Sequence, residues 1–254
     1  MDLGVTVERL RAAGCVFAED EARLLLDQAA SPADLESMVD RRAAGEPLEQ
    51  ILGWALFRGL RIAVEPGVFV PRRRTEFLVD RAVPLLRPGA VVVDLCCGSG
   101  AIGAAIADTV DNLDLYAADV DPAAVRCARR NLPPTAHVYQ GDLYEPLPAS
   151  LRGRVAVLAA NVPYVPSDEI GMMPPEARDY EPRFALDGGA DGLDLLRRVA
   201  ADAAGWLRPG GHLLIETSEP QSPYAMEVFA GYGLTPRVAV DDDVGACIVI
   251  GRSG

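Results

Sequence analysis

Four short apolar runs between residues 91 and 161 constrain the fold of this chain more than any other feature. They cover residues 91–95, 113–118, 136–139 and 155–160. Segments with helical spacing separate the first three runs, beginning at Ala101 and at Asp121, where Asp121 is suited to an N-cap and Pro122 to the first turn. Runs of this length are typical of strands buried on both faces, and their alternation with helices indicates a parallel sheet. The region therefore predicts an α/β fold built from strand–helix–strand units.

Glycines and polar side chains follow each of these runs. They are Cys96, Cys97, Gly98, Ser99 and Gly100 after the first run, Asp119 after the second, Asp142 and Leu143 after the third, and Asn161 after the fourth. Because the carboxyl ends of parallel strands meet at one edge of a sheet, we expect these residues to form a ligand site there. Gly98 and Gly100 permit close approach of a ligand to the backbone. The full G-x-G-x-x-G dinucleotide motif is absent, so the two glycines alone are a weak signal.

Each acidic residue at this edge has an expected role. Asp119 follows the glycines by about 20 residues, a position from which an acid accepts hydrogen bonds from ribose hydroxyls. Asp142 is placed to meet the amino group of a base, with Leu143 packing on the ring of that base. Together the three strand ends predict a site for a ribose-containing cofactor.

Asn161, Val162, Pro163 and Tyr164 end the fourth run with a different chemistry. The Asn161 amide offers both donors and an acceptor, and Pro163 favours an extended backbone at Val162, which fixes the direction of the Val162 carbonyl. Tyr164 adds an aromatic face and a hydroxyl. The four residues could hold an NH₂ group between two acceptors and stack against the plane behind it. A strand followed by an ordinary Asn-x-Pro turn is the simpler interpretation of the motif alone.

Composition narrows the possible functions. The formal charge of −13 argues against a non-specific grip on nucleic acid, which needs a basic surface. All 24 basic residues are arginine, which excludes Schiff-base lysines and a Walker-type phosphate loop. Five cysteines without paired spacing and only two histidines do not favour a metal site, so we predict none. No apolar run reaches the length of a membrane span and no signal peptide is evident, so we expect a cytoplasmic protein without membrane contacts.

The segments on either side of this region complete the predicted organisation. Residues 1–48 are expected to form a small helical domain, with a helix start at Ser31 and Pro32, and residues 49–74 a β-hairpin connector that turns near Arg58 and Gly59. Residues 75–254 form the main domain, in which Thr75 is expected to cap the first helix.

The second half of the main domain begins with a long loop. Residues 165–192, rich in proline, glycine and acids, are expected to form a lid or a substrate-docking segment. The remaining elements are predicted as helices over residues 193–206 and 221–229 and strands over residues 212–217, 234–240 and 246–250, with the first helix leading through residues 209–211 into the strand over residues 212–217.

The motifs of this chain resemble those of the protein-glutamine N5-methyltransferases that modify the Gly-Gly-Gln loop of peptide-chain release factors. The resemblance extends over nearly the whole chain. It rests on Gly45-Glu46-Pro47-Leu48 with Gly53 and Phe57, Pro71-Arg72 with Thr75-Glu76, the turn from Asp94 to Gly100, Asp119, Asn161-x-Pro-Tyr, Glu181-Pro182-Arg183, Ala185-Leu186-Asp187-Gly188-Gly189, Asp191-Gly192-Leu193 and Arg208-Pro209-Gly210-Gly211. The blocks between Glu181 and Leu193 are the most specific part of it.

The resemblance implies a class I methyltransferase fold, with a seven-stranded, mostly parallel, doubly wound sheet and a helical N-terminal domain. It implies S-adenosyl-L-methionine as methyl donor, S-adenosyl-L-homocysteine as product and a release factor as the protein substrate. In such a protein the turn from Cys96 to Gly100 would wrap the methionine part of the donor, Asp119 would hold its ribose, and Asp142 with Leu143 its adenine. Asn161 and the Val162 carbonyl would hold the glutamine amide.

Four departures from the family pattern cluster near the predicted site. Val162 replaces the first proline of Asn-Pro-Pro-Tyr, Arg73-Arg74 replace a proline and an acid, Thr217-Ser218 replace Ile-Gly, and Cys96-Cys97 replace a pair of smaller residues. They leave three alternatives open: a methyltransferase with another acceptor, an adenine-N6 methyltransferase acting on nucleic acid, and a protein that binds the cofactor without turnover.

Overall fold

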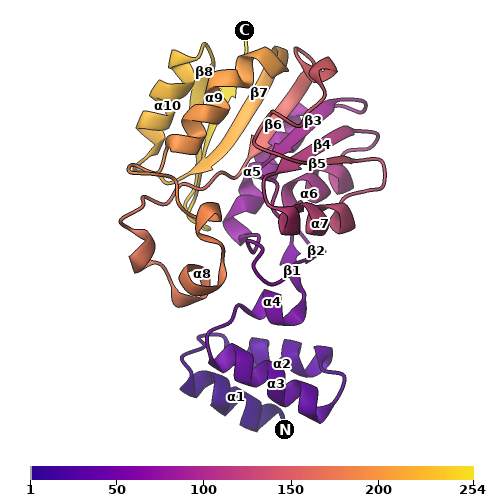
Figure 1. The fold of residues 1–254 in the computed structure, drawn as a ribbon, viewed down its shortest axis with the longest axis vertical. Helices are drawn as coiled ribbons and strands as arrows, with labels where there is room; N and C mark the ends of the chain where they lie inside the picture. The colour runs from indigo at the N-terminus through magenta and orange to yellow at the C-terminus, as the bar shows by residue number, and fades with distance from the viewer. Residues whose placement is uncertain (1) are drawn as a thin grey trace.

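The computed structural model describes residues 2–254 and begins with a helical module. Helices α1 (Leu3–Ala12), α2 (Ala18–Gln28), α3 (Pro32–Ala43) and α4 (Leu48–Leu52) lie at the end of the molecule farthest from the sheet (Figure 1). Leu10, Leu25 and Val39 form the centre of their own small core. The predicted helix start is confirmed, because Ser31 Oγ accepts a hydrogen bond from Asp34 N at 3.1 Å and Pro32 occupies the first turn.

The predicted hairpin is also confirmed. Strands β1 (Trp54–Phe57) and β2 (Leu60–Ala63) pair antiparallel and turn at Arg58 and Gly59, which have φ values of +49° and +79°. Two successive positive φ values are what a tight two-residue hairpin turn requires. The chain then continues through buried Val68 and Val70, which pack against Ala124 and Cys127 of the main domain. The domain limits expected at residues 48 and 74 stay a prediction.

Seven strands form the main sheet. They are β3 (Val91–Leu95), β4 (Asp114–Asp119), β5 (His137–Gln140), β6 (Val155–Ala160), β7 (Leu207–Thr217), β8 (Thr235–Asp241) and β9 (Ala246–Arg252), in the order β5-β4-β3-β6-β7-β9-β8. Within this sheet the β7–β9 and β8–β9 pairings are antiparallel and the other four pairings are parallel. The predicted seven-stranded, mostly parallel sheet is therefore confirmed, and the four apolar runs form adjacent strands in its first half.

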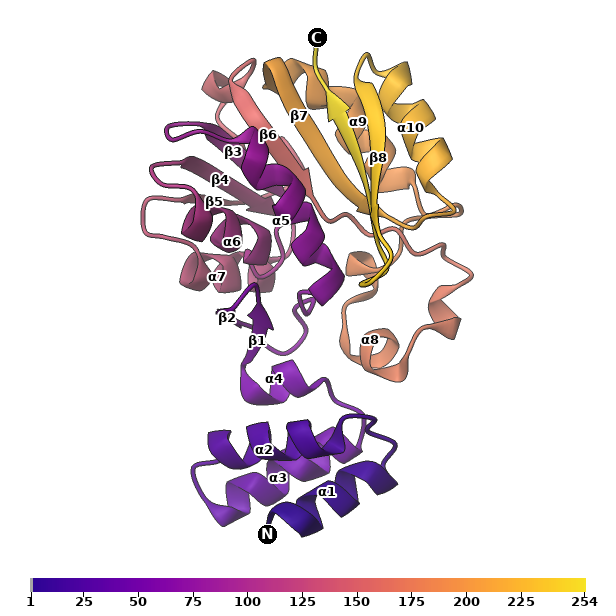
Figure 2. The same ribbon diagram turned by 180° about the vertical axis from the view of Figure 1, so that it is seen from behind.

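Helices cover both faces of this sheet, as Figures 1 and 2 show from opposite sides. Helices α5 (Glu76–Ala82), α6 (Ala101–Thr109) and α7 (Pro122–Asn131) share one core with the sheet, and α9 (Asp194–Trp206) and α10 (Ser222–Gly231) share the other. The remaining helices are short: η1 (Arg73–Thr75), η2 (Val83–Leu85), η3 (Ala149–Leu151), η4 (Ile170–Met172), α8 (Pro175–Tyr180) and η5 (Arg183–Ala185). Within residues 2–254, no helix combines the length and the apolar character needed to cross a membrane.

Two local predictions are corrected by the structure. The strand predicted to begin at residue 212 begins at Leu207 and includes residues 209–211, where Gly210 N donates to Ser253 O at 3.2 Å and Ser253 N donates to Gly211 O at 2.9 Å. The predicted side-chain cap at Thr75 is wrong. Thr75 has helical backbone angles and ends η1, which runs into α5, whereas a capping side chain needs an extended backbone. The cap predicted at Asp121 is confirmed by a 2.9 Å hydrogen bond from Ala123 N to Asp121 Oδ1.

Candidate active site

A cavity of about 760 Å³ opens at the carboxyl ends of the parallel strands, where the sequence predicts the ligand site. Of the residues predicted there, Cys96, Gly98, Asp119, Asp142, Leu143, Asn161, Val162, Pro163 and Tyr164 line it. Cys97 and Ser99 are buried and Gly100 packs closely on Ala128, so these three residues of the turn after β3 do not line it. The structure thus brings nine of the twelve predicted residues to one cavity, and the other three lie beside them in the same turn.

The turn after β3 is held by the neighbouring strand. Cys97 N donates to Ala118 O at 3.1 Å, and Gly98 N donates to Asp119 Oδ2 at 2.8 Å. Gly98 has φ of +53°, and a Cβ added there would meet no atom within 4 Å, so this glycine leaves open space at the cavity wall. Gly100 is required for packing instead: with φ of +80°, its added Cβ would lie 3.1 Å from Ala128 Cα.

Asp94, in β3 two residues before this turn, does not line the cavity and is a supporting residue to which the sequence analysis gave no role. It is completely buried, and its Oδ2 accepts a 2.9 Å hydrogen bond from Gly103 N in the first turns of α6. Its Oδ1 has no hydrogen-bond partner among residues 2–254. Burial raises the pKa of Asp94 to about 7, against the opposing effect of the Gly103 N–H. An acid inside an otherwise apolar strand was the available signal in the sequence.

Asp119 faces the cavity with part of its hydrogen-bonding capacity still available. Its two oxygens accept from Gly98 N and from Asp121 N, at 2.8 and 2.9 Å. An ionised carboxylate offers about four acceptor positions, so about two remain for ligand hydroxyls. Burial raises the pKa of Asp119, while the backbone N–H groups of Asp121 and Gly98 lower it.

Asp142 and Leu143 lie on the same wall, beside an arginine that the sequence did not single out. Arg198, from α9, donates to Asp142 Oδ2 at 2.6 Å, and both side chains line the cavity. Leu143 has φ of +49°, an uncommon backbone conformation for a branched residue. The contact with Arg198 directs the Asp142 carboxylate at this end of the cavity.

Thr75, the first residue after the connector, orients the side chain of Asn161. Asn161 Nδ2 lies 3.4 Å from Thr75 Oγ1, and the Thr75 side chain is buried. Within residues 2–254, no hydrogen bond reaches Asn161 Oδ1, so the amide oxygen is left as an acceptor. Val162 is almost fully buried and still lines the cavity, next to Pro163. Thr75 therefore contributes to the site as an orienting group, not as the helix cap that the sequence suggested.

Tyr164 is fixed by a buried acid and an arginine. Its hydroxyl donates to Glu216 Oε1 at 2.9 Å, and Arg74 Nε donates to the same oxygen at 3.2 Å. The Arg74 guanidinium also lies 5.9 Å from the centre of the Tyr164 ring. Burial and the Glu216 charge raise the pKa of Tyr164, so the phenol remains a proton donor. Arg74, one of the departures from the family pattern, is thus part of the cavity wall.

Residues 165–192 pass over this end of the sheet and contribute to the cavity through Ser167, Met173 and Phe184, among others. Gln221 ties this segment to the strand-end motif, because its Nε2 donates to Tyr164 O and to Asp191 O, both at 2.9 Å. Gln221 Oε1 accepts in turn from Thr217 Oγ1 and Ser218 Oγ. Thr217 and Ser218, which depart from the family pattern, therefore orient the Gln221 side chain. A lid role for residues 165–192 stays a prediction.

Glu181 attaches residues 165–192 to the connector. Its buried carboxylate accepts from Val70 N at 3.0 Å and pairs with Arg72. Burial raises the pKa of Glu181, with Arg72 lowering it.

Within residues 2–254, no three His, Cys, Asp or Glu side chains lie close enough together to hold a metal ion.

Comparisons with known proteins agree on a methyltransferase. The "Methyltransferase small domain" family matches residues 59–167. A release factor glutamine methyltransferase from Geobacter sulfurreducens is 35% identical over 231 residues, covering 89% of this chain and 80% of the relative. One from Mycolicibacterium smegmatis is 37% identical over 250 residues, covering 95% and 88%. Among solved structures, a methyltransferase from Pyrococcus furiosus shares the fold, with a TM-score of 0.58 at 18% identity over 78% of this chain and 90% of that one.

Proposed function

The chain belongs to the release factor glutamine methyltransferase family, and on that basis we propose that it transfers a methyl group from S-adenosyl-L-methionine to a glutamine side-chain amide of a peptide-chain release factor. The acceptor is the glutamine of the Gly-Gly-Gln loop, at its N5 nitrogen. The observation that carries the proposal is the meeting of two sets of groups in one cavity: Asp119 and the turn after β3 on one side, Asn161 with Val162 and Tyr164 on the other.

The donor side of the cavity offers the polar groups and the open space that the cofactor needs. Asp119 keeps acceptor positions for the ribose hydroxyls, and the open space at Gly98 admits the methionine part close to the backbone. Asp142 and Leu143 take the adenine, with Asp142 directed by Arg198. The bound sulfonium supplies an activated methyl group on a good leaving group, so the protein needs to provide neither a metal ion nor a covalent intermediate.

The acceptor amide is held by Asn161 and Val162. A primary amide nitrogen is a weak nucleophile, because its lone pair is delocalised into the carbonyl. Asn161 Oδ1 and the Val162 carbonyl each accept one of its two hydrogens, which raises the electron density on nitrogen and aligns it with the methyl group. Thr75 keeps the Asn161 amide in this orientation through its contact with Nδ2. Tyr164 forms the wall behind the amide plane.

Tyr164 does not act as the base in this scheme. Its phenol donates to Glu216 and has a raised pKa, so it remains protonated. The amide proton leaves during or after transfer, and water is the acceptor consistent with the residues around the motif. The Val162 departure leaves this scheme intact, because only the Val162 carbonyl is used and Pro163 still favours an extended backbone there.

As part of the same proposal, the reaction takes place in the cytoplasm. All five cysteines are free thiols in the structure, which is the usual state of cysteines in that compartment.

Methyl transfer to a release factor tests the proposal. Purified chain, radiolabelled S-adenosyl-L-methionine and release factors from the same organism are combined, and the labelled peptide is identified by mass spectrometry. We expect one methyl group on the Gly-Gly-Gln glutamine. A matched release factor with alanine at that glutamine is expected to remain unlabelled. Cofactor binding without label in any release factor would contradict the assignment of the acceptor.

A further inference from the structure

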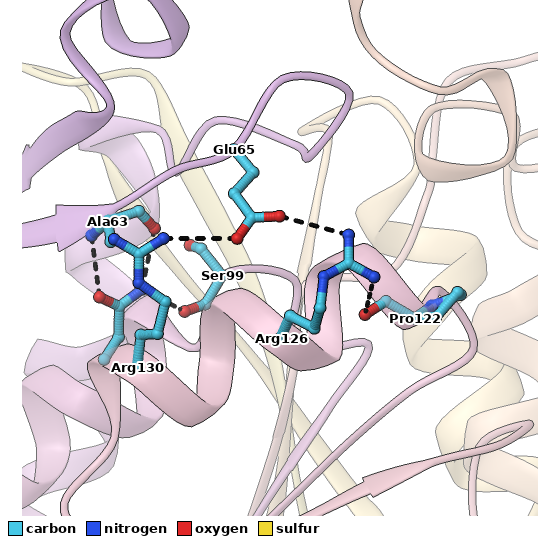
Figure 3. Close-up of polar contacts among 7 residues, drawn as sticks. Ala63, Glu65, Ser99, Pro122, Arg126 and Arg130 are labelled. Carbon is cyan, nitrogen blue, oxygen red and sulfur yellow. Dashed lines mark hydrogen bonds and ion pairs between the residues drawn. The ribbon is translucent and has the colours of Figure 1, made fainter.

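One side-chain amide at the end of α7 joins the connector to the turn after β3. Asn131 Oδ1 accepts from Ala63 N at 2.8 Å, and Asn131 Nδ2 donates to Ala63 O at 2.9 Å. The same Nδ2 donates to Ser99 O at 2.8 Å. The two contacts with Ala63 imitate the pairing of a neighbouring strand, and the third reaches the turn that lies against the donor site. Figure 3 labels Ala63 and Ser99 and draws these contacts as dashed lines.

Ser99 belongs to this turn but does not line the cavity. Its side chain is buried, and the next residue, Gly100, packs closely on Ala128 of the same helix. The cavity side of the turn is held by Asp119 through Gly98 N. Asn131 therefore holds the turn from behind, opposite the carboxylate that holds it from the front.

A second contact joins the connector to α7 without reaching the turn. Glu65 lies between Arg126 and Arg130, with 3.3 Å from each arginine to a Glu65 oxygen (Figure 3). The arginine side chains are 58% and 60% exposed, so these ion pairs are weak. Glu65 fastens the same connector to the same helix and, within residues 2–254, makes no hydrogen bond or ion pair with the turn, which makes it a control for Asn131.

We propose that Asn131 is a positioning residue for the donor site: by fixing Ser99 O to Ala63, it links docking of the connector to the affinity for S-adenosyl-L-methionine. This inference rests on the proposed function and assigns a residue to it that contacts neither substrate.

The expected effect follows from preorganisation. Without Asn131, the Ser99 and Ala63 carbonyls lose their shared donor, and the turn samples conformations that do not bind the cofactor. The apparent dissociation constant then rises in inverse proportion to the competent fraction. Acceptor binding and the chemical step use other residues, so they change little once the cofactor site is saturated.

Calorimetric titration of S-adenosyl-L-homocysteine into the full-length chain tests the inference. Asn131→Ala removes all three hydrogen bonds, and Asn131→Asp keeps the acceptor for Ala63 N but loses both donors. Of the lost hydrogen bonds, the one to Ser99 O is the one that reaches the turn. We therefore expect either variant to raise the dissociation constant about tenfold, which corresponds to the net contribution of about one hydrogen bond. Glu65→Gln is expected to stay within about twofold of the wild type. In steady-state methyl transfer, KM for S-adenosyl-L-methionine should rise in the Asn131 variants while kcat at saturating cofactor stays near the wild-type value.

Several results would overturn the inference. Wild-type affinity in both Asn131 variants would show that the Ser99 contact is not needed, and an equal loss in Glu65→Gln would assign the effect to connector docking in general. An unchanged KM with a lower kcat, or variants that do not fold even with excess S-adenosyl-L-homocysteine, would indicate a purely structural residue. If the wild-type chain itself bound no S-adenosyl-L-homocysteine, the proposed function would fail together with this inference. Wild-type binding and methyl transfer with unaffected variants would overturn the inference alone.

Discussion

The hydroxyl of Tyr164 donates a hydrogen bond to the buried carboxylate of Glu216, with 2.9 Å between Tyr164 Oη and Glu216 Oε1. The contact joins the end of the Asn161 motif to the end of β7, so the aromatic wall of the acceptor pocket is held by a residue in a non-adjacent part of the sequence. Glu216 Oε2 has no hydrogen-bond partner among residues 2–254. The carboxylate therefore depends on Tyr164 and Arg74, and each can be removed separately.

Tyr164→Phe keeps the ring and removes the hydroxyl. We expect the free energy of unfolding to fall by about 1–2 kcal/mol, because a buried carboxylate loses a donor. The rate of methyl transfer should fall while the affinity for S-adenosyl-L-homocysteine stays unchanged. Urea denaturation and single-turnover transfer measure the two effects. Tyr232→Phe, at an exposed tyrosine outside the cavity, is the control, and equal behaviour of the two variants would show that the Glu216 contact is unimportant.

Arg74→Gln tests the charge balance of Glu216. The variant leaves the buried carboxylate with the Tyr164 hydroxyl but without its cation, and we expect a loss of about 1–2 kcal/mol in the free energy of unfolding, limited because the Arg74 side chain is 45% exposed. The double variant Arg74→Gln with Glu216→Gln should recover part of the loss, since no uncompensated charge remains. Arg73→Gln is the neighbouring control, because Arg73 is exposed and makes no ion pair within residues 2–254. Strict additivity in the double-mutant cycle would rule out the coupling.

Asp94 gives the stability a defined pH dependence. Its pKa of about 7 in the native state lies above the ordinary value of 3.8, so the native state binds this proton more tightly than the unfolded chain. Its contribution to stability is complete below the ordinary pKa and is lost as the pH rises through about 7. Relative to Asp94→Asn, the wild type should therefore lose stability between about pH 5 and about pH 8. Urea denaturation at both pH values measures this difference.

Asp108→Asn, on the exposed side of α6, is the control for this pH effect. It should leave the pH dependence of the wild type unchanged. A wild type and an Asp94→Asn variant with parallel pH profiles would contradict the assignment of a raised pKa to Asp94.

Gln221→Glu tests the clamp between the Asn161 motif and residues 165–192. The substitution keeps the shape but removes the two donors to Tyr164 O and Asp191 O. We expect KM for the release factor to rise about tenfold or more, because two carbonyls lose their donor at the acceptor pocket. The dissociation constant for S-adenosyl-L-homocysteine should hardly change. Gln28→Glu, in the helical module, is a control for the added charge; a similar rise in KM there would remove the support for a specific clamp.

The strand-end residues of the site were predictable because they depend on local spacing. Asp119 and Asn161 each follow an apolar run, and a parallel sheet brings the ends of such runs together whatever lies between them. The connector turn at Arg58 and Gly59 and the cap at Asp121 were predictable for the same reason, since both depend on neighbouring residues.

The partners of these residues were not predictable, because they come from distant parts of the chain. Thr75 is 86 residues from Asn161, Arg198 is 56 from Asp142, and Glu216 is 52 from Tyr164. No spacing rule connects such pairs. The sequence predicts a helix cap at Thr75 and indicates no role for Arg198 or Glu216. The Thr75 prediction failed in the same way: its hydroxyl was assigned to the nearest helix, whereas tertiary packing brings it to Asn161.

Single-turnover methyl transfer by Asn161→Ala tests the central claim most directly. The wild type and the variant are saturated with S-adenosyl-L-methionine and mixed with the release factor, while calorimetry with S-adenosyl-L-homocysteine reports on the donor site. The account predicts a rate at least about 100-fold lower in the variant, because the amide loses one of its two acceptors and its alignment. The affinity for S-adenosyl-L-homocysteine should change less than about fivefold. A variant that transfers methyl groups at nearly the wild-type rate would contradict the claim that Asn161 holds the acceptor amide.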